Sequence, residues 1–346
     1  MKKPPVEFLQ MLRLAGLADK DETPVFEELT GGVASDIWRA DLRRGPVCVK
    51  KALAKLKVAQ DWRASVDRNA FEAAWLETAA RIIPGTAPRV LAHDADAGMF
   101  AMEYLDPAHF KSWKDELLDG RADPSFAAEV GRRLAQIHSA TAGDGNIAKR
   151  FSTDDIFHAI RLSPYLEATA LAHPALAAPL TALLDVTAAN HFALVHGDVS
   201  PKNIFIGPEG PVFVDAECAW YGDPAFDLAF CLNHLLLKCL AVPAAAAAYL
   251  ECFGALADGY LKALTSGLRG AGQAGNEAGI EARVARLLPG LLLARVDGKS
   301  PIEYLTQDTD KDRVRRAAAG MLLEPPARLD EVRDNWESEL SGGPKR

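Results

Sequence analysis

Three polar side chains in one stretch of the sequence could do phosphate chemistry together: Asp198, Asn203 and Asp215. In proteins, Mg²⁺ is usually held by one or two carboxylates together with the phosphate oxygens of a substrate. Two oxygen ligands beside a further carboxylate therefore suit a hard cation that carries phosphates. The residue types indicate phosphoryl transfer assisted by Mg²⁺.

A predicted β-hairpin places two of these side chains at one open end. The runs 204–206 and 212–214 are rich in β-branched and aromatic residues, and the Gly-Pro-Glu-Gly segment between them indicates a turn. With this turn at the centre, Asn203 falls opposite Val214 or Asp215. Directly opposed residues have Cβ atoms only ~5 Å apart, so the amide and the carboxylate are expected to face the same site.

The spacing around Asp198 resembles a known family. His196-Gly197-Asp198, followed by Asn203, is similar to the HGD-x-x-x-x-N loop of the aminoglycoside phosphotransferase and choline kinase superfamily. In kinases the Asp of this loop accepts the substrate hydroxyl proton and the Asn binds Mg²⁺. The resemblance implies a protein-kinase-like fold, ATP and Mg²⁺ as cofactors, and Asp198 as the catalytic residue. An ordinary polar turn is the alternative, and the agreement of several separate elements disfavours it.

The segment after the hairpin narrows the resemblance. Asp215-Ala216-Glu217 stands where protein kinases carry Asp-Phe-Gly, and with the aromatic residues that follow it resembles methylthioribose kinase-type sugar kinases. Such kinases commonly carry Ser at the position of Asn203, so a close relative fits as well. Asn203, Asp215 and Glu217 are the candidate metal ligands.

A predicted strand and a predicted helix near the N-terminus carry candidate residues for binding the phosphates of the nucleotide. In Val47-Cys48-Val49-Lys50, alternation places the valines on one face and Lys50 on the other. The run resembles the kinase V-A-I-K strand, whose Lys holds the α- and β-phosphates. The neighbouring Lys51 is the alternative, but alternation places it on the same face as the valines. Glu72, on a predicted helix over residues 68–82, is the expected partner of Lys50.

Two further segments complete the nucleotide site that the resemblance implies. Gly31-Gly32, with Ser35, is similar to the Gly-Gly-x-x-Ser loop that covers the phosphates in these phosphotransferases, although a glycine pair can also be a plain hairpin turn. The backbone of a predicted hinge is expected to meet the adenine edge. The hinge residues are Met102, Glu103, Tyr104 and Leu105.

The acceptor side is indicated by residues that follow the metal ligands. Lys202 could neutralise the transferred phosphate, and Trp220 and Tyr221 are expected to border the acceptor because they follow Glu217 closely. In a late charged segment, Arg295 and Lys299 are candidates, and Arg295 is the position that the sugar-kinase resemblance favours. Carboxylates with aromatic faces suit a polyol, whose hydroxyl groups need acceptors and whose ring needs an apolar wall.

These segments predict an α+β, two-lobed, protein-kinase-like fold. A nucleotide-binding lobe over residues 1–103 would hold a five-stranded antiparallel sheet and a helix, and a mostly helical catalytic and substrate-binding lobe would follow over residues 104–346. The periodic segment 126–141 is predicted to be a helix beneath the catalytic loop.

Composition excludes several function classes. The chain has 346 residues, of which 49% are hydrophobic, and a net charge of −8 disfavours nucleic-acid binding and polybasic membrane attachment. No apolar run approaches the ~18 residues of a membrane span. The five cysteines are scattered and show no metal-ligand spacing, which is typical of reduced thiols in the cytoplasm. A monomer or homodimer is expected.

Other nucleotide-binding classes fit less well. Gly298-Lys299-Ser300 resembles the end of a Walker A loop, but Leu293 stands where that motif requires Gly. A protein kinase is disfavoured because only residues 216–226 separate Asp215 from Asp227, which leaves no room for a long activation segment.

The predicted function is therefore an ATP-dependent phosphotransferase acting on an alcohol group of a small molecule, with a sugar such as methylthioribose or a related polyol first. An aminoglycoside or choline-like amino-alcohol acceptor is the alternative. A catalytically weak nucleotide-binding pseudokinase is the second alternative, and the intact set of Lys50, Asp198, Asn203 and Asp215 argues against it.

Overall fold

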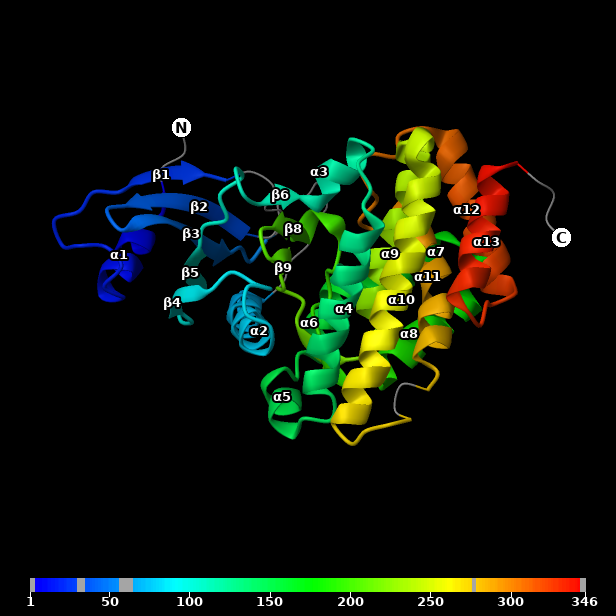
Figure 1. Cartoon of the computed structure of the whole chain (residues 1–346), viewed down its shortest axis with the longest axis horizontal. Helices are drawn as coiled ribbons and strands as arrows, with labels where there is room; N and C mark the ends of the chain where they lie inside the picture. Colours follow the sequence, from blue (N-terminus) through cyan, green and yellow to red (C-terminus); the bar gives the residue numbers. More distant parts are fainter. Residues whose placement is uncertain (1–3, 30–34, 56–64, 276–277, 343–346) are drawn as a thin grey trace.

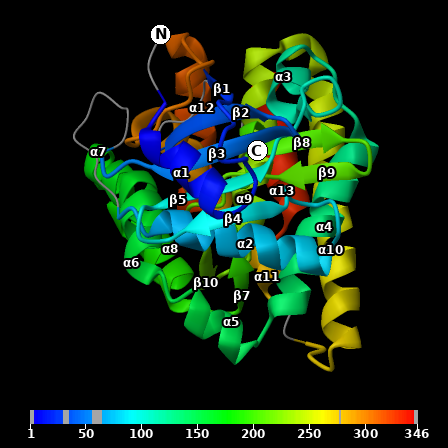
Figure 2. The ribbon, with the colours of Figure 1, turned by 90° about the vertical axis from the view of Figure 1, so that its left-hand side faces the viewer.

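A β-sheet lobe and a larger helical lobe make up the structure, a computed structural model that describes residues 4–29, 35–55, 65–275 and 278–342. Figure 1 shows the sheet and its helices at one end of the molecule and the helices from α4 onward at the other. In Figure 2 the sheet lies in front of the helical lobe. The predicted α+β, two-lobed class is confirmed.

The small lobe is one antiparallel sheet with a helix on each side. Its strands lie in the order β1-β2-β3-β5-β4. The elements are α1 (Val6–Leu14), β1 (Val25–Glu28), β2 (Ser35–Leu42), β3 (Gly45–Ala52), α2 (Arg68–Ile82), β4 (Val90–Asp94) and β5 (Met99–Glu103).

Alternation along β3 decides which side chain faces the other lobe. Val47 and Val49 enter the apolar cluster that contains Phe8 of α1, whereas Cys48 enters the larger core on the opposite face. Lys50 shares the face of Cys48 because successive strand side chains point to opposite sides. The predicted phase of this strand is confirmed.

Helices make up most of the larger lobe. Its elements are β6 (Lys111–Ser112), α3 (Trp113–Leu118), α4 (Pro124–Thr141), α5 (Gly145–Arg150), α6 (Asp154–Phe157), the π-helical segment η1 (His158–Glu167), α7 (Ala168–Ala172), η2 (Pro174–Leu176), α8 (Ala177–Ala189), β7 (Ala193–Val195), η3 (Pro201–Asn203), β8 (Ile204–Gly207), β9 (Gly210–Phe213), β10 (Trp220–Gly222), α9 (Ala225–Ala241), η4 (Pro243–Ala245), α10 (Ala246–Gly270), α11 (Ile280–Asp297), α12 (Asp308–Leu323) and α13 (Leu329–Leu340).

The helix α9 forms the centre of this lobe. It is apolar on nearly all sides and packs against α10 and α11, so every residue from Ala225 to Leu240 is buried. The five cysteines are all buried and unpaired. Charged residues on so enclosed a helix are costly unless they are paired, which makes Asp227 and Lys238 on α9 notable.

The predicted hairpin is present as β8 and β9. Ile206 lies opposite Pro211 and Gly207 opposite Gly210, which matches a turn centred between the two glycines. The backbone N–H of Val214 donates to the carbonyl of Asn203 (3.0 Å), so the pairing continues to the open end.

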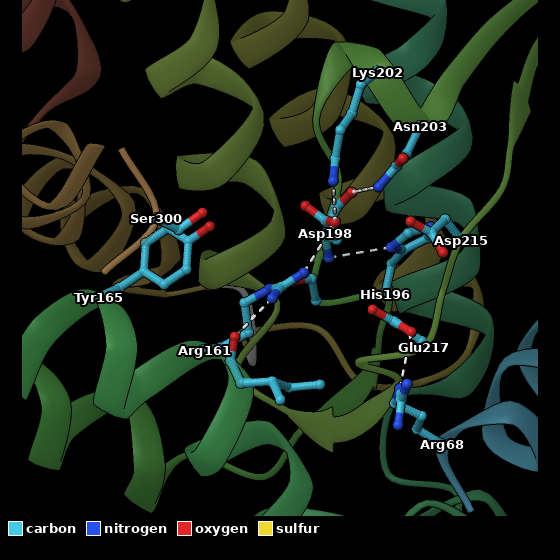
Figure 3. A network of polar contacts seen from close by, with 12 residues as sticks. Arg68, Arg161, Tyr165, His196, Asp198, Lys202, Asn203, Asp215, Glu217 and Ser300 are labelled. Carbon is cyan, nitrogen blue, oxygen red and sulfur yellow. Dashed lines mark hydrogen bonds and ion pairs between the residues drawn. The ribbon is translucent and has the colours of Figure 1, made fainter. Parts of the chain in front are cut away.

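The segment η1 is an uncommon feature of the helical lobe. Its ten residues are π-helical and contain Pro164. Most π-helices are single-turn bulges, and they occur frequently at functional sites. Arg161 and Tyr165, four residues apart, both come from this segment and lie on the same side of Asp198 (Figure 3).

Among the described residues, no single helix is long and apolar enough to cross a membrane. A pair bent by 116°, residues 154–172 with 174–189, meets the length and composition criteria only when taken together.

Candidate active site

The loop between β7 and β8 is held from beneath by Asp227. Its two carboxylate oxygens accept the backbone N–H groups of His196 (2.7 Å) and Gly197 (2.8 Å). His138 lies 3.2 Å from the same carboxylate and 2.8 Å from the hydroxyl of Tyr260. Asp227 thus braces this loop, and His138 is a core histidine whose ring nitrogens both have partners.

His196 ties this loop to the end of the hairpin. Its Nε2 lies 3.1 Å from the carbonyl oxygen of Val214, and its Nδ1 accepts the backbone N–H of Asp198 at 3.2 Å. Burial lowers the pKa of His196 despite the nearby carboxylates. The neutral ring, with its proton on Nε2, satisfies both contacts and fixes the loop against the strand.

Gly197 allows the loop to turn in a crowded place. Its φ is +78°, and a Cβ there would lie 2.6 Å from the carbonyl oxygen of Cys218. Glycine adopts this conformation without a steric penalty and leaves room for the neighbouring backbone. The carbonyl of Gly197 accepts a hydrogen bond from Nε of Arg161.

Asp198 lies between two cations and is buried (Figure 3). Its Oδ2 is 2.9 Å from Arg161 Nη2 and 3.2 Å from Lys202 Nζ, and its backbone carbonyl accepts from Asn203 Nδ2 at 3.0 Å. Burial alone would raise the pKa of Asp198, but Lys202 and then Arg161 outweigh burial and lower it. The carboxylate is therefore ionised at neutral pH.

Asp215 is the other carboxylate at the open end of the hairpin. It adopts φ +66°, a conformation that is uncommon for a residue with a Cβ and is a recurring feature of functional sites. Burial would raise its pKa, but the ammonium of Lys50 and then Lys202 lower it well below the usual range.

The donor set at this end suits a hard cation. Asn203 uses its amide nitrogen to hold the loop, which leaves its amide oxygen for another partner, and Asp215 contributes carboxylate oxygens. Across the described residues, no group of three or more His, Cys, Asp or Glu side chains could hold a metal ion. Waters or phosphate oxygens would complete the coordination of a cation held here.

The predicted ion pair between Lys50 and Glu72 is present. The Nζ of Lys50 lies 2.8 Å from Oε1 of Glu72 and also contacts Oδ1 of Asp215, which joins β3, α2 and the hairpin end in one network. Burial raises the pKa of Glu72 to about 7 although Lys50 opposes this shift.

Glu217 is held by the small lobe. Arg68, at the start of α2, donates from Nε to Oε2 of Glu217 at 3.0 Å (Figure 3). Its other nitrogens donate to the carbonyls of Ser65 and Leu53. One Glu217 oxygen is therefore already paired. Its role as a metal ligand stays a prediction.

Only some of the residues predicted to bind the nucleotide are among the described residues. Gly31 and Gly32 lie outside the described residues, and Ser35 is the buried first residue of β2. At the hinge, the Glu103 amide already donates to the carbonyl of Arg89 (3.0 Å), so that amide is not available to adenine. Met102, Tyr104 and Leu105 are buried or half-buried, and their role stays a prediction.

The expected aromatic wall of the acceptor site is wrong. Trp220 is 1% exposed, stacks on Phe157 with ring centroids 4.3 Å apart, and donates from Nε1 to Asp154 (2.9 Å). Tyr221 is also buried. Both residues belong to β10, which pairs with β7, so strand pairing draws them into the core rather than along the loop of Asp215.

The charged residues of the late segment 295–299 lie in different environments. Arg295 points inward, donating from Nη1 to the hydroxyl of Tyr165 (3.1 Å) and to Ser300. Asp297 instead pairs with Arg315 and His173. Lys299 is exposed, and its role at the acceptor stays a prediction. The helix α11 ends at Asp297, just before Lys299.

Sequence reasoning missed Arg161. It is 7% exposed and reaches Asp198 from a segment 37 residues earlier in the chain. The only local signal is a cation inside an apolar run, between Ile160 and Leu162, which by itself does not name a partner. The contact depends on how η1 packs beneath the loop.

Part of this chain is similar in sequence to known proteins. The chain is 29% identical over 226 residues to methylthioribose kinase from Yersinia pseudotuberculosis serotype O:3 (strain YPIII), which covers 57% of this chain and 54% of that protein. It is 29% identical over 262 residues to methylthioribose kinase from Pectobacterium carotovorum subsp. carotovorum (strain PC1), covering 67% and 64%. The chain thus spans about half to two thirds of the length of these curated relatives.

Solved structures share the fold. Choline kinase from Cryptosporidium parvum Iowa II superposes with a TM-score of 0.58 at 11% identity, over 95% of this chain and 99% of that one. Amicoumacin kinase hAmiN, in complex with AMP-PNP, Ca²⁺ and Ami, superposes with a TM-score of 0.52 at 12% identity, over 94% and 96%. The predicted kinase-like fold is confirmed.

The family model described as the phosphotransferase enzyme family matches residues 25–264, a span that runs from β1 into α10 and includes the small-lobe sheet, the loop of Asp198 and the hairpin. The chain belongs to this phosphotransferase family.

Proposed function

We propose that the protein transfers the γ-phosphate of ATP to an alcohol group of a small molecule. The observation that carries the proposal is the single network in which Lys50 contacts both Glu72 and Asp215 while Asn203 holds the loop of Asp198. These groups come from both lobes. The nucleotide is therefore proposed to lie between the lobe of residues 1–103 and that of residues 104–346.

Each group has a distinct proposed role toward ATP. Asn203 and Asp215, with Glu217 as a third candidate, would hold Mg²⁺, which neutralises phosphate charge when it is bound. Lys50, oriented by Glu72, would grip the α- and β-phosphates. The Gly31-Gly32 and Ser35 loop and the hinge residues Met102, Tyr104 and Leu105 are proposed for the rest of the nucleotide.

Asp198 is proposed to orient the acceptor hydroxyl and receive its proton. Because Lys202 and Arg161 lower its pKa, it is a weak base that does not remove the proton from a ground-state alcohol. A weak base is sufficient for phosphoryl transfer, since the transition state is loose and needs positioning and charge stabilisation above all. Lys202 and Arg161 are proposed to stabilise the transferred phosphate.

For the acceptor, we propose a sugar or sugar-like alcohol. Methylthioribose is the first compound to test, because the curated relatives carry that activity in their names. A choline-like amino-alcohol or an aminoglycoside is the alternative. A monomer or homodimer in the cytoplasm remains the expectation for the protein itself.

The test is phosphate transfer from γ-labelled ATP to a panel of pentoses, thiopentoses, amino-alcohols and aminoglycosides, with a generic protein substrate alongside. Transfer to an alcohol of the panel, abolished by Asp198→Ala, is expected. Transfer only to choline or an aminoglycoside would contradict the sugar assignment and leave the kinase assignment standing. ATP binding with no transfer to any compound would favour a pseudokinase.

A further inference from the structure

Positive charge continues beyond Asp198 on the side away from Asp215. Figure 3 shows Arg161, Tyr165 and Ser300 on that side. The guanidinium of Arg161 lies 5.8 Å from the ring centroids of both Tyr165 and Phe230. Tyr165 in turn accepts from Arg295 Nη1 at 3.1 Å. A continuous set of contacts therefore leads from the predicted phosphoryl-transfer point toward α9 and α11.

One face of α9 extends this set. Phe230, His234 and Lys238 are spaced by four residues, so they share a face of the helix and cover about 12 Å along it. The rings of Phe230 and His234 have centroids 5.6 Å apart. Tyr304 contacts both His234 and Lys238. Its hydroxyl lies 3.4 Å from His234 Nδ1, and its ring centroid lies 4.5 Å from Lys238 Nζ.

Two cationic groups in this cluster have nitrogen atoms without a partner. Lys238 is 1% exposed, and among the described residues its ammonium has neither a hydrogen bond nor an ion pair. The Nε of Arg295 is also buried and lacks an acceptor within the described part of the chain. The carboxylate of Glu303 is engaged by Lys114. Arg295 and Lys238 are therefore not neutralised by a paired carboxylate.

Burial and neighbouring positive charges disfavour the charged forms of Lys238 and His234. Burial, followed by the charge of Lys114, lowers the pKa of Lys238 to about 8, with Glu303 opposing and Arg295 adding to the shift. At neutral pH the amine is still mostly protonated. Burial lowers the pKa of His234 as well, and the charges of Arg295, Lys238 and Lys202 add to that shift, so the cluster is within electrostatic reach of the catalytic loop.

A buried cation such as Lys238 without a counter-charge is unfavourable unless a ligand supplies one. We propose that Lys238, Arg295, His234 and Tyr304 form a subsite for an anionic group, a carboxylate or a phosphate, on the acceptor alcohol. This inference rests on the proposed kinase function. It narrows the acceptor to an acidic polyol, such as a sugar acid or sugar phosphate, with its reacting hydroxyl at Asp198 and its anion beside Tyr304.

The same charges disfavour the alternative acceptors. The ammonium groups of choline or an aminoglycoside would lie close to Lys238 and Arg295, and like charges in a buried site repel strongly. A neutral sugar would leave both cations without a partner. Methylthioribose is thus the neutral reference compound against which acidic acceptors are compared.

The first experiment compares kcat/KM for D-ribose, D-ribonate and D-ribose 5-phosphate, with methylthioribose and choline alongside. At least one acidic compound is expected to exceed D-ribose by roughly tenfold or more. The ribonate and phosphate arms separate the two sources of the anion. Equal or better turnover of the neutral compounds would overturn the subsite and leave the kinase function standing.

The second experiment uses Lys238→Met, which removes the charge and keeps the length of the side chain. The KM for the acidic acceptor is expected to rise roughly 10- to 100-fold. The KM for ATP is expected to stay unchanged, and the thermal midpoint is expected not to fall. Lys262→Met is the matched control, since Lys262 is an exposed lysine on α10. An unchanged KM for the acidic acceptor in Lys238→Met would contradict the proposal.

A binding measurement separates failure of the subsite from failure of the proposed function. Calorimetric titration with D-ribonate and D-ribose 5-phosphate needs no turnover, and binding that Lys238→Met removes would support the subsite even if no alcohol were phosphorylated. If neither acidic probe binds the wild-type protein, with or without ATP and Mg²⁺, the subsite is wrong.

Discussion

Arg161 reaches the carboxylate of Asp198 from a π-helical segment, with 2.9 Å between its Nη2 and Oδ2 of the aspartate. The same guanidinium donates from Nε to the carbonyl of Gly197, so one side chain sets both the charge and the backbone of the loop. Planar, multiply bonded arginine contacts fix orientation as well as charge. This relationship makes the properties of Asp198 dependent on a part of the chain that carries no recognisable motif.

Asp198→Ala is expected to reduce phosphoryl transfer by about 10²–10⁴-fold while ATP binding is retained, because the side chain acts on the acceptor hydroxyl. Initial rates and ATP titrations measure the two properties separately. Asp258→Ala is the control, since Asp258 is an exposed carboxylate that pairs with the exposed Lys262. Wild-type kcat in Asp198→Ala would remove this residue from the mechanism.

Arg161→Gln is expected to move the acid limb of the pH–rate profile to higher pH. Arg161 lowers the pKa of Asp198, so its removal raises that pKa and the carboxylate becomes protonated at a higher pH. Loss of positioning should also reduce kcat by roughly 10- to 100-fold. Arg132→Gln on the surface of α4 is the control. A fall in stability with an unmoved acid limb would show that Arg161 has only a structural role.

Asn203→Ala and Asp215→Ala should each raise the Mg²⁺ concentration needed for half-maximal activity. The Asp215 variant should be the more severe because it removes a charge. Mg²⁺ titrations of the initial rate at saturating ATP test this. If both titrations match the wild type, the end of the hairpin does not hold the metal.

Gly197→Ala is expected to lower the free energy of unfolding by about 2–4 kcal/mol, because the new Cβ needs a strained φ and lies 2.6 Å from the Cys218 carbonyl. Urea denaturation measures the change. Gly254→Ala in α10 is the control, since nothing lies within 4 Å of its Cβ position and a helical alanine should stabilise by up to about 1 kcal/mol. Equal stability of the two variants would contradict the predicted clash.

Lys238→Met should stabilise the ligand-free protein at pH 7, by on the order of 3 kcal/mol for a lysine whose pKa falls from 10.5 to about 8. Between these pH values the unfolded chain binds the extra proton, so the wild-type free energy of unfolding should rise with pH. The variant should lose that rise. The charged and titratable groups around the amine are Lys114, Glu303, Arg295, Cys231, His234 and Tyr304. Denaturant titrations from pH 7 to pH 10 test this, and parallel curves for both proteins would contradict it.

Local pattern determined much of the fold and part of the site. The turn between β8 and β9 fixes the register, so the place of Asn203 at the open end followed from a period of two. The same alternation predicted that Lys50 faces away from the valines and toward Glu72. Both inferences held because strand geometry leaves few alternatives once the turn is placed.

Tertiary packing decided the rest. Trp220 and Tyr221 follow the metal loop in sequence, yet pairing of β10 with β7 buries them in the core. Arg161 and Lys238 lie in apolar runs whose sequence predicts only buried helix. Arg161 contacts Asp198 because η1 packs beside the loop, and Lys238 contacts the ring of Tyr304 because α9 packs against the segment that contains Tyr304. Charge interactions depend on distance and burial, and neither is encoded in the spacing of residues along one segment.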